Sequence, residues 1–365
     1  MSFSQGTPDD VPAAEASAIH DAGLAASYTA LREDEAIALA RERYGLEGQV
    51  TRFATEKDDT FRLELPGGER FVLKVANPLE EVPEIDFQVR LLEHIEGADP
   101  HIPVPRVIRD LAHRPHAPFV DAAGQQRVVR LMSYVAGTPL DSVASCAADR
   151  AQVGRMLGRL RHATAGFSHP AQDRVLAWDV RHLQRLRPLL DDIDDPHQHR
   201  RVAAGLARLA DLAPRIARLR TQVLHNDFSQ SNIVVDAGQP GFVTGIIDFG
   251  DAVRTAVAVD VSTALLNQLP RQGVHVHTDL FADGRDLLRG YLAVADLTPE
   301  ELALIPHLTM ARAVARALLS LWRAKRFPEN ATYLLRNTEP GWAQLDWFLA
   351  RTEADLSDTL PAALR

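Results

Sequence analysis

The chain has 365 residues, a length that fits one large domain or two modest ones. Hydrophobic residues make up 46% of it and charged residues 24%, the composition of an ordinary soluble globular protein. The net charge of −9 argues against a general nucleic-acid binder, which would present a basic face. The single cysteine, Cys146, excludes an intrachain disulfide and fits a reducing compartment.

Residues 1–30 are acidic, polar and rich in alanine, and we expect them to form a flexible tail. They lack the basic start and the apolar core of a signal peptide. The chain also lacks a run of roughly 18 apolar residues, which a membrane span requires. The sequence therefore predicts a cytoplasmic protein without a membrane-spanning segment.

Helix and strand patterns alternate in the first third of the chain. Residues 31–45 have apolar side chains at helical spacing and end in glycine, which predicts a helix with a glycine C-cap. Residues 49–78 contain three strand-like runs with turn residues between them, which predicts an antiparallel meander. A second helix is expected over residues 81–97, and a strand over residues 125–140 runs into a glycine and proline break.

Beyond residue 148 the pattern becomes mainly helical, apart from one stretch around residues 223–251. We expect helices at residues 148–165, 181–190, 199–220, 256–269, 279–294, 298–326 and 341–354. Strands grouped first and helices afterwards are typical of an α+β protein. The predicted fold has two lobes, a small antiparallel sheet and then a mostly helical part that contains one β-hairpin.

Several signatures of large enzyme classes are missing from the sequence. The chain has no Gly-Lys dipeptide, so it has no Walker-type phosphate loop, and it has no G-x-G, so it lacks a dinucleotide fingerprint. It also has no G-x-S-x-G and no H-E-x-x-H.

The stretch "HNDFSQSN" concentrates oxygen ligands between apolar runs. It has the pattern H-x-D-x-x-x-x-N, with His225, Asp227 and Asn232, and an Asp-Phe-Gly triplet follows from Asp248. Protein kinases use this pairing: the first Asp accepts the proton of the substrate hydroxyl, and the Asn and the second Asp hold Mg²⁺. We expect "IVVD" and "TGIID" to pair as a hairpin that carries Asp248 back beside Asn232. The alternative is a chance cluster of turn residues around a hairpin.

Two neighbours of this stretch are expected to support it. His225 is predicted to hold the loop through a backbone hydrogen bond, without titrating in catalysis. Asp260, on the next predicted helix, is predicted to brace the same loop.

Lysine is scarce among the 40 basic residues of the chain. The three lysines are Lys57, Lys74 and Lys325. Lys74 lies in an apolar strand pattern, as the phosphate-binding lysine of kinases does, which favours a functional role. The alternative is a strand-edge lysine with its head group in water. The acidic or amide partner of Lys74 on the following helix stays open among Glu84, Asp86 and Gln88.

These motifs resemble those of the aminoglycoside phosphotransferase and choline kinase superfamily, small-molecule kinases with a protein-kinase-like fold. The runs "HNDFSQSNIVVD" and "GIIDFGDAVRT" most resemble the hydroxylysine kinase-like branch, and kinase domains fused to class III aminotransferases show similar runs. The run "ATEKDDTFRLEL" resembles the nucleotide loop of that branch, and "YLLRNTEPGWAQL" its C-terminal helix entry. The resemblance covers about residues 31–355.

The resemblance implies a role for each matching residue. Asp227 would be the catalytic base, Asn232 and Asp248 would bind Mg²⁺, and Lys74 would bind phosphate of the donor, ATP or GTP. The residues implied in nucleotide binding besides Lys74 are Thr60 and the backbone near Ser133 and Val135. Gln88 stands where the family usually has the glutamate that pairs with the lysine, which puts that ion pair in doubt. The implied division is a tail at 1–30, a nucleotide-binding N-lobe at 31–135 and a helical catalytic and substrate-binding C-lobe at 136–365.

The acceptor is expected to be small. Asn226 replaces the Arg of the kinase H-R-D motif, and the ten residues from Gly250 to Asp260 leave no room for a segment that docks a peptide. The candidate acceptor-binding residues are Asp251, Arg254, Trp178 and Asp179. A Trp face beside a carboxylate suits an ammonium group, and an arginine can hold a carboxylate. The alternatives are a core position for Trp178, a helix N-cap for Asp179 and a supporting role for Asp251.

We therefore predict a kinase that transfers the γ-phosphate of ATP or GTP, with Mg²⁺, directly to a hydroxyl of a small amine or amino acid such as hydroxylysine or an amino alcohol. The alternatives are an aminoglycoside kinase and a non-catalytic nucleotide-binding pseudokinase. We expect no nucleic-acid, membrane or peptide partner, and a monomer or a homodimer.

Overall fold

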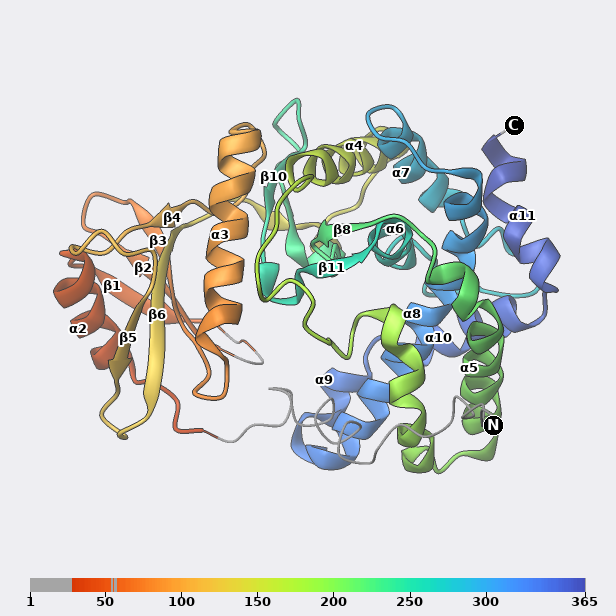
Figure 1. The fold of residues 1–365 in the computed structure, drawn as a ribbon, viewed down its shortest axis with the longest axis horizontal. Helices are drawn as coiled ribbons and strands as arrows, with labels where there is room; N and C mark the ends of the chain where they lie inside the picture. The colour runs from red at the N-terminus through yellow and green to blue at the C-terminus, as the bar shows by residue number, and fades with distance from the viewer. Residues whose placement is uncertain (1–27, 54, 56–57, 365) are drawn as a thin grey trace, which may run out of the picture.

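The computed structural model describes residues 28–364, except residues 54, 56 and 57. Most of the tail expected over residues 1–30 lies outside the described residues, and so does Lys57. The described chain forms two lobes, a small one built on a sheet and a larger helical one (Figure 1). The α+β, two-lobed fold expected from the sequence is confirmed.

The small lobe is an antiparallel sheet with a helix on each side. Its strands are β1 (Gln49–Arg52), β2 (Asp59–Glu64), β3 (Arg70–Val75), β4 (Val107–Ile108), β5 (Ala117–Val120) and β6 (Gln126–Ser133). The strand order is β1-β2-β3-β6-β4, and β5 pairs with β6. The meander expected over residues 49–78 is confirmed as β1, β2 and β3.

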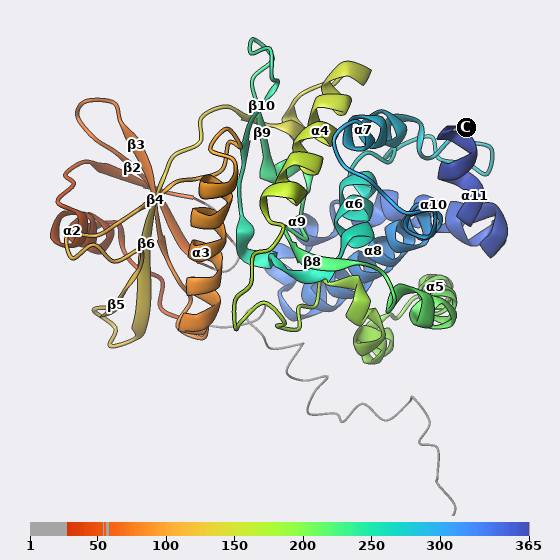
Figure 2. The same cartoon turned by 45° about the horizontal axis from the view of Figure 1, so that its top comes forward.

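Two helices flank this sheet. Helix α2 (Glu33–Tyr44) ends at Gly45, whose φ of 67° is the left-handed conformation that glycine adopts without strain. Helix α3 (Val82–Ala98) lies between the sheet and the large lobe in both views (Figures 1 and 2). Side chains of α3 can therefore reach both lobes.

Short strands of the large lobe lie on the side that faces α3 (Figure 1). Strands β9 (Ile233–Val235) and β10 (Val243–Ile246) form the expected hairpin, which β7 (Thr138–Pro139) extends. Strands β8 (Thr221–Leu224) and β11 (Val253–Ala256) form a second antiparallel pair that the sequence analysis did not predict.

The rest of the large lobe is helical. Its α-helices are α4 (Ala147–Ala163), α5 (Pro196–Ile216), α6 (Val257–Leu266), α7 (Ala282–Leu292), α8 (Pro299–Arg326), α9 (Ala331–Leu335), α10 (Thr338–Leu349) and α11 (Glu353–Leu364). Its 3₁₀ segments are η1 (Leu140–Ser142), η2 (Val180–Asp192), η3 (Gln230–Asn232), η4 (Phe249–Asp251) and η5 (Pro328–Asn330). The segment expected as a helix over 181–190 is the 3₁₀ segment η2, in which Pro188 lacks the N–H that an α-helix needs. Helices α9 and α11 were not predicted.

Helix α8 is the centre of the large lobe. It packs against α5, α6, α10, α11 and η2. Its length and hydropathy would fit a membrane span, but 83% of its apolar window is buried inside the protein, as expected of a core helix. Because α8 lies at the centre of the large lobe, its polar side chains can reach the interior of that lobe.

Helices α4 and α7 are in backbone contact because each has a glycine at the crossing. A Cβ at Gly154 would lie 1.8 Å from the Leu287 carbonyl oxygen, and a Cβ at Gly290 would lie 1.9 Å from the Ala151 carbonyl oxygen. Both distances are far inside van der Waals contact, so the two positions require glycine.

Candidate active site

Hydrogen bonds hold the loop after β8 to the Ile247 backbone and to the Asp260 side chain. The His225 Nε2 atom lies 3.0 Å from the Ile247 carbonyl oxygen, and its Nδ1 accepts a hydrogen bond from the Asp227 N–H at 3.3 Å. The Asn226 N–H donates to the Asp260 carboxylate at 2.8 Å. The expectations that His225 holds this loop and that Asp260 braces it are confirmed.

Asn226 adopts a left-handed backbone conformation, with a φ of 61°. Asparagine tolerates this conformation better than most residues, which accounts for its place between His225 and Asp227. After this turn the Asp227 side chain takes no part in the hydrogen bonds that His225 makes to Ile247 and Asn226 makes to Asp260.

Asp227 and Asn232 are in direct contact. The Asn232 Nδ2 atom donates to the Asp227 carboxylate at 2.7 Å and to the Asp227 carbonyl oxygen at 3.0 Å. Since the amide nitrogen is used in this way, the amide oxygen of Asn232 is left to face another partner. An amide oxygen is a hard ligand of the kind that Mg²⁺ prefers.

The β9–β10 hairpin brings Asp248 beside Asn232, as the spacing predicted. Ile246 pairs with Ile233, and the Ile247 N–H donates to the Asn232 carbonyl oxygen at 2.9 Å. Asp248 follows with a φ of 61°, an uncommon conformation for a residue with a side chain. Such local strain often occurs at functional sites.

Lys74, on β3, reaches across from the small lobe to this group. Its Nζ lies 3.8 Å from the Asp248 carboxylate, so the two motifs found in the sequence meet at one place. The Lys74 ammonium lowers the pKa of Asp248, and burial opposes this effect.

The partner of Lys74 in the small lobe is Asp58, at 3.8 Å, and not an acid of α3. The Asp58 carboxylate also accepts a hydrogen bond from Arg130 at 3.1 Å, and Arg130 donates to the Gln88 amide oxygen at 3.1 Å. Gln88 therefore supports the arginine that holds Asp58. The sequence analysis left this choice open among α3 residues and did not consider Asp58.

Glu84 and Asp86, the two acids of α3 that the sequence offered as partners of Lys74, have partners in the large lobe. Glu84 forms an ion pair with Arg174 at 3.3 Å. Asp86 lies 3.0 Å from His116 and 3.1 Å from His169. Neither acid is directed to Lys74, and both tie α3 to segments distant in sequence.

The carboxylates of Asp227, Asp248 and Asp251 gather at one place. Burial raises the pKa of Asp227; the charge of Arg312 opposes this rise and that of Asp248 adds to it. Burial, followed by the charges of Asp227 and Asp248, raises the pKa of Asp251 to about 6. A divalent cation would relieve this mutual repulsion, which fits a metal held by Asn232 and Asp248.

The residues that the sequence suggested for nucleotide binding differ in whether their polar groups already have hydrogen-bond partners. Thr60 lies opposite Lys74 across β2 and β3, and its buried hydroxyl has no hydrogen-bond partner among the described residues. The Ser133 N–H and hydroxyl are both bonded to the Arg106 backbone at 2.8 Å, so that N–H is not available to a base. In the part of the chain that the structure describes, the Val135 backbone makes no hydrogen bond and remains available.

Asp179 and Arg254, which the sequence suggested for acceptor binding, already have partners within the protein. Asp179 is fully buried, caps η2 through the Arg181 N–H at 3.1 Å and accepts from the Thr255 hydroxyl at 2.9 Å. The alternative prediction, a helix N-cap, is correct for Asp179. Arg254 is exposed and forms an ion pair with Asp173 at 2.6 Å.

Arg312 is the residue of this site that the sequence analysis missed. It lies on α8, donates to the Asp227 carboxylate at 3.1 Å and also donates to the Trp178 carbonyl oxygen. Its guanidinium lies 5.2 Å from the centre of the Trp178 ring, so that ring already faces a cation. Asp251 alone of the four candidate acceptor residues keeps a carboxylate near Asp227.

The chain matches the phosphotransferase enzyme family over residues 49–297. It belongs to that family. The matched region contains Lys74, Asp227, Asn232 and Asp248 and ends before α8, so Arg312 lies outside it.

Relatives of this phosphotransferase include small-molecule kinases. It is 22% identical to the hydroxylysine kinase of Mus musculus over 338 residues, which cover 86% of this chain and 88% of the relative. It is 26% identical to the homoserine kinase of Chelativorans sp. (strain BNC1) over 265 residues, which cover 70% of this chain and 74% of the relative. This phosphotransferase is a small-molecule kinase, as the sequence predicted.

Solved structures show the same fold. The amicoumacin kinase hAmiN, in complex with AMP-PNP, Ca²⁺ and Ami, superposes with a TM-score of 0.65 at 18% identity, covering 89% of this phosphotransferase and 93% of that chain. The microcompartment-associated aminopropanol kinase superposes with a TM-score of 0.62 at 20% identity, covering 88% and 97% of the two chains. The likeness extends over both lobes.

Proposed function

We propose that this phosphotransferase transfers the γ-phosphate of ATP or GTP, with Mg²⁺, to a hydroxyl of a small amine or amino acid. One observation carries the proposal. Lys74 contacts Asp248, and the N–H of the preceding residue, Ile247, bonds to the Asn232 carbonyl oxygen. The Asn232 amide in turn bonds to Asp227, so the series runs from a cation that suits phosphate to a carboxylate that suits a hydroxyl. A kinase site needs these groups together and in this order.

Each residue of the series has a distinct task in the proposed reaction. Asp227 accepts the proton of the acceptor hydroxyl and orients it, while Arg312 and Asn232 fix the direction of its carboxylate. Lys74 stabilises the negative charge of the donor phosphates. Bound to Asn232 and Asp248, Mg²⁺ would supply further charge neutralisation. Transfer is direct, because the loose transition state requires no nucleophile from the protein.

Two features favour a small acceptor with an amino group. The chain is similar to a hydroxylysine kinase over 86% of its length and to a homoserine kinase over 70% of its length. The segment after Asp248 is short, because β11 begins at Val253 and leads directly into α6. No long segment is available there to bind a peptide.

The test is phosphate transfer from ATP and from GTP, with Mg²⁺, to a panel of acceptors. The panel contains hydroxylysine, homoserine, ethanolamine, choline and an aminoglycoside. The wild type is compared with Asp227→Ala and with Asp211→Ala, which changes an exposed aspartate of α5. We expect turnover of one acceptor class by the wild type and by Asp211→Ala, and none by Asp227→Ala.

The other outcomes separate the alternatives. Nucleotide binding without transfer to any acceptor would favour a pseudokinase. Transfer to the aminoglycoside alone would favour an antibiotic kinase. Transfer that survives in Asp227→Ala would show that another residue is the base.

A further inference from the structure

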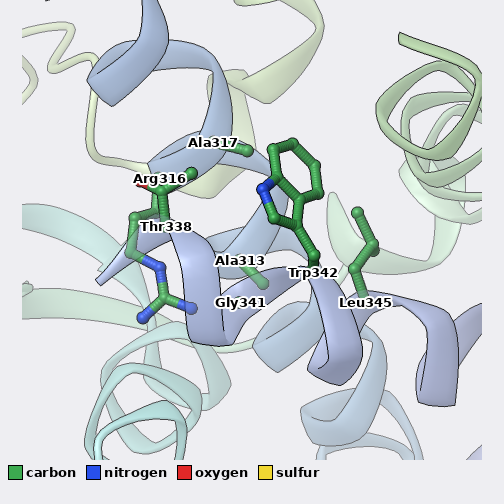
Figure 3. A pocket seen from close by; sticks show the side chains of 7 residues that line it. All are labelled: Ala313, Arg316, Ala317, Thr338, Gly341, Trp342 and Leu345. Atoms are coloured by element: carbon green, nitrogen blue, oxygen red, sulfur yellow. The ribbon is translucent and has the colours of Figure 1, made fainter. Parts of the chain in front are cut away.

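Two adjoining cavities lie between α8 and α10 and share one residue, Arg316. The first is narrow and is also lined by Thr338, Gly341 and Trp342 (Figure 3). The second is also lined by Arg271.

Arg316 has no acidic partner. Its guanidinium donates to the Gln344 amide oxygen at 2.9 Å, and no carboxylate of the described residues lies within ion-pair distance. Burial, together with the positive charges of Arg271 and Arg312, lowers the pKa of Arg316 to about 10. A partly buried cation among other cations is unfavourable until an anion binds.

The first turn of α10 adds groups that suit an anion. The Thr338 hydroxyl is buried and has no hydrogen-bond partner among the described residues. The N-terminus of a helix carries unpaired N–H groups and a partial positive charge. Gly341 permits the approach of Arg316 to this turn, because a Cβ there would lie 2.8 Å from the Arg316 Nη2 atom. Glu339, in the same turn, is exposed and does not line either cavity.

This cation is close to the proposed catalytic base along α8. Arg312 bonds to Asp227, and Arg316 follows four residues later on the same face of the helix. Four residues correspond to a rise of about 6 Å. An anion at Arg316 would thus lie roughly one helical turn along α8 from the arginine that bonds to Asp227, a span that suits a small hydroxy acid.

We propose that Arg316 and Arg271, with the first turn of α10, bind the carboxylate of the acceptor. The acceptor is then a hydroxy amino acid, and amino alcohols and aminoglycosides lack the group that this site recognises. The inference rests on the proposed function and narrows its acceptor class. It also replaces Arg254, which the sequence suggested for a carboxylate, by an arginine that has no acidic partner among the described residues.

The experiment uses two pairs of acceptors that differ only in the carboxylate. They are homoserine with 3-aminopropan-1-ol, and hydroxylysine with its decarboxylated diamine. The wild type is compared with Arg316→Gln, Arg316→Lys and Arg271→Gln, and with Arg326→Gln as the control on an exposed part of α8. The values of kcat and KM are measured for each acceptor and for ATP.

We expect the wild type to prefer one carboxylate-bearing acceptor by roughly 10- to 100-fold in kcat/KM, the size of one or two charge-assisted hydrogen bonds. Arg316→Gln should raise the KM of that acceptor by a similar factor and leave the KM of ATP and the use of the amino alcohol unchanged. Arg316→Lys should restore part of the preference. Arg271→Gln, an exposed change that is safe for folding, should weaken it too.

Binding separates failure of the inference from failure of the proposed function. Calorimetry with homoserine and hydroxylysine, in the presence of a non-hydrolysable ATP analogue, detects the carboxylate site even without turnover. Binding that is lost in both Arg316→Gln and Arg271→Gln supports the site. Equal use or equal binding of both members of each pair overturns the inference and leaves the kinase assignment standing. An equal loss for both members in Arg316→Gln would show a purely structural role.

Discussion

Asp58 and Lys74 form an ion pair in the small lobe, with the Asp58 carboxylate 3.8 Å from the lysine Nζ. The acid precedes β2, and Arg130 of β6 holds it at 3.1 Å. The position of Lys74 therefore depends on the sheet, whereas Glu84 and Asp86 of α3 bind to the large lobe.

The first prediction concerns this pair. Asp58→Asn removes the negative charge beside Lys74 and leaves the buried Arg130 without its acid. We expect the KM for ATP to rise about tenfold, the loss of one charge-assisted interaction. Glu84→Gln is the control, because Glu84 pairs with Arg174 and not with Lys74. An equal effect of the two changes on the KM for ATP would contradict the assignment.

The second prediction concerns Arg312 and the pKa of Asp227. Arg312 opposes the effect of burial, so Arg312→Gln should raise the pKa of Asp227 further. The proposed base must be ionised, and the acid limb of kcat should therefore move to higher pH. Arg312→Lys keeps the charge and should move the limb less. The measurement is kcat between about pH 5 and 9; an unmoved limb in Arg312→Gln would show that this arginine does not tune the base.

The catalytic motifs could be predicted because they are local. His225, Asp227 and Asn232 lie on one loop, and the hairpin that returns Asp248 has strands that follow one another in the chain. Spacing alone places such residues together. The two-lobed fold followed from the order of the strand and helix patterns for the same reason.

The partners of these residues could not be predicted, because they come from distant segments. Arg312 lies 85 residues from Asp227, and Arg130 lies 72 residues from Asp58. An arginine on a core helix resembles any other arginine until the helix is placed. Only tertiary packing selects which charged side chains meet.

One missed element did have a local signal. The N-terminus of α11 is capped by Thr352, whose hydroxyl accepts from the Asp355 N–H at 3.2 Å and donates to the Asp355 carboxylate at 2.7 Å. A threonine three residues before an acid is a known helix start. The predicted helix over 341–354 ran across this signal, whereas α10 ends at Leu349.

The third prediction tests the contact between α4 and α7. Gly290→Ala places a Cβ against the Ala151 carbonyl oxygen, so the helices must separate. We expect the free energy of unfolding to fall by roughly 1–3 kcal/mol or more. Gly97→Ala, in α3, is the control, because nothing lies within 4 Å of its Cβ. It should raise stability by roughly 0.5–1 kcal/mol. Urea unfolding measures both, and equal effects would show that the crossing tolerates a methyl group.

The fourth prediction concerns His307, which α8 buries beneath α11. Burial, with the charges of Arg208 and Arg215, lowers the pKa of His307 from 6.5 to about 4. Its Nε2 lies 3.0 Å from the Ser357 hydroxyl. Between these two pKa values the unfolded chain binds the proton and the folded chain does not, so stability is complete above about pH 6.5 and falls as the pH is lowered to about 4.

His307→Gln removes the group that binds this proton. The free energy of unfolding should therefore fall less between pH 7 and 4.5 than in the wild type, by up to roughly 3 kcal/mol. His101→Gln, at an exposed histidine, is the matched control and should leave the pH dependence as in the wild type. Urea unfolding at several pH values gives the slopes directly. Since other groups also titrate in this range, the decisive quantity is the difference between the wild type and each variant. If the unfolding free energy of His307→Gln changes with pH as steeply as that of the wild type, then His307 is protonated in the folded protein or gains a hydrogen-bond partner on acidification.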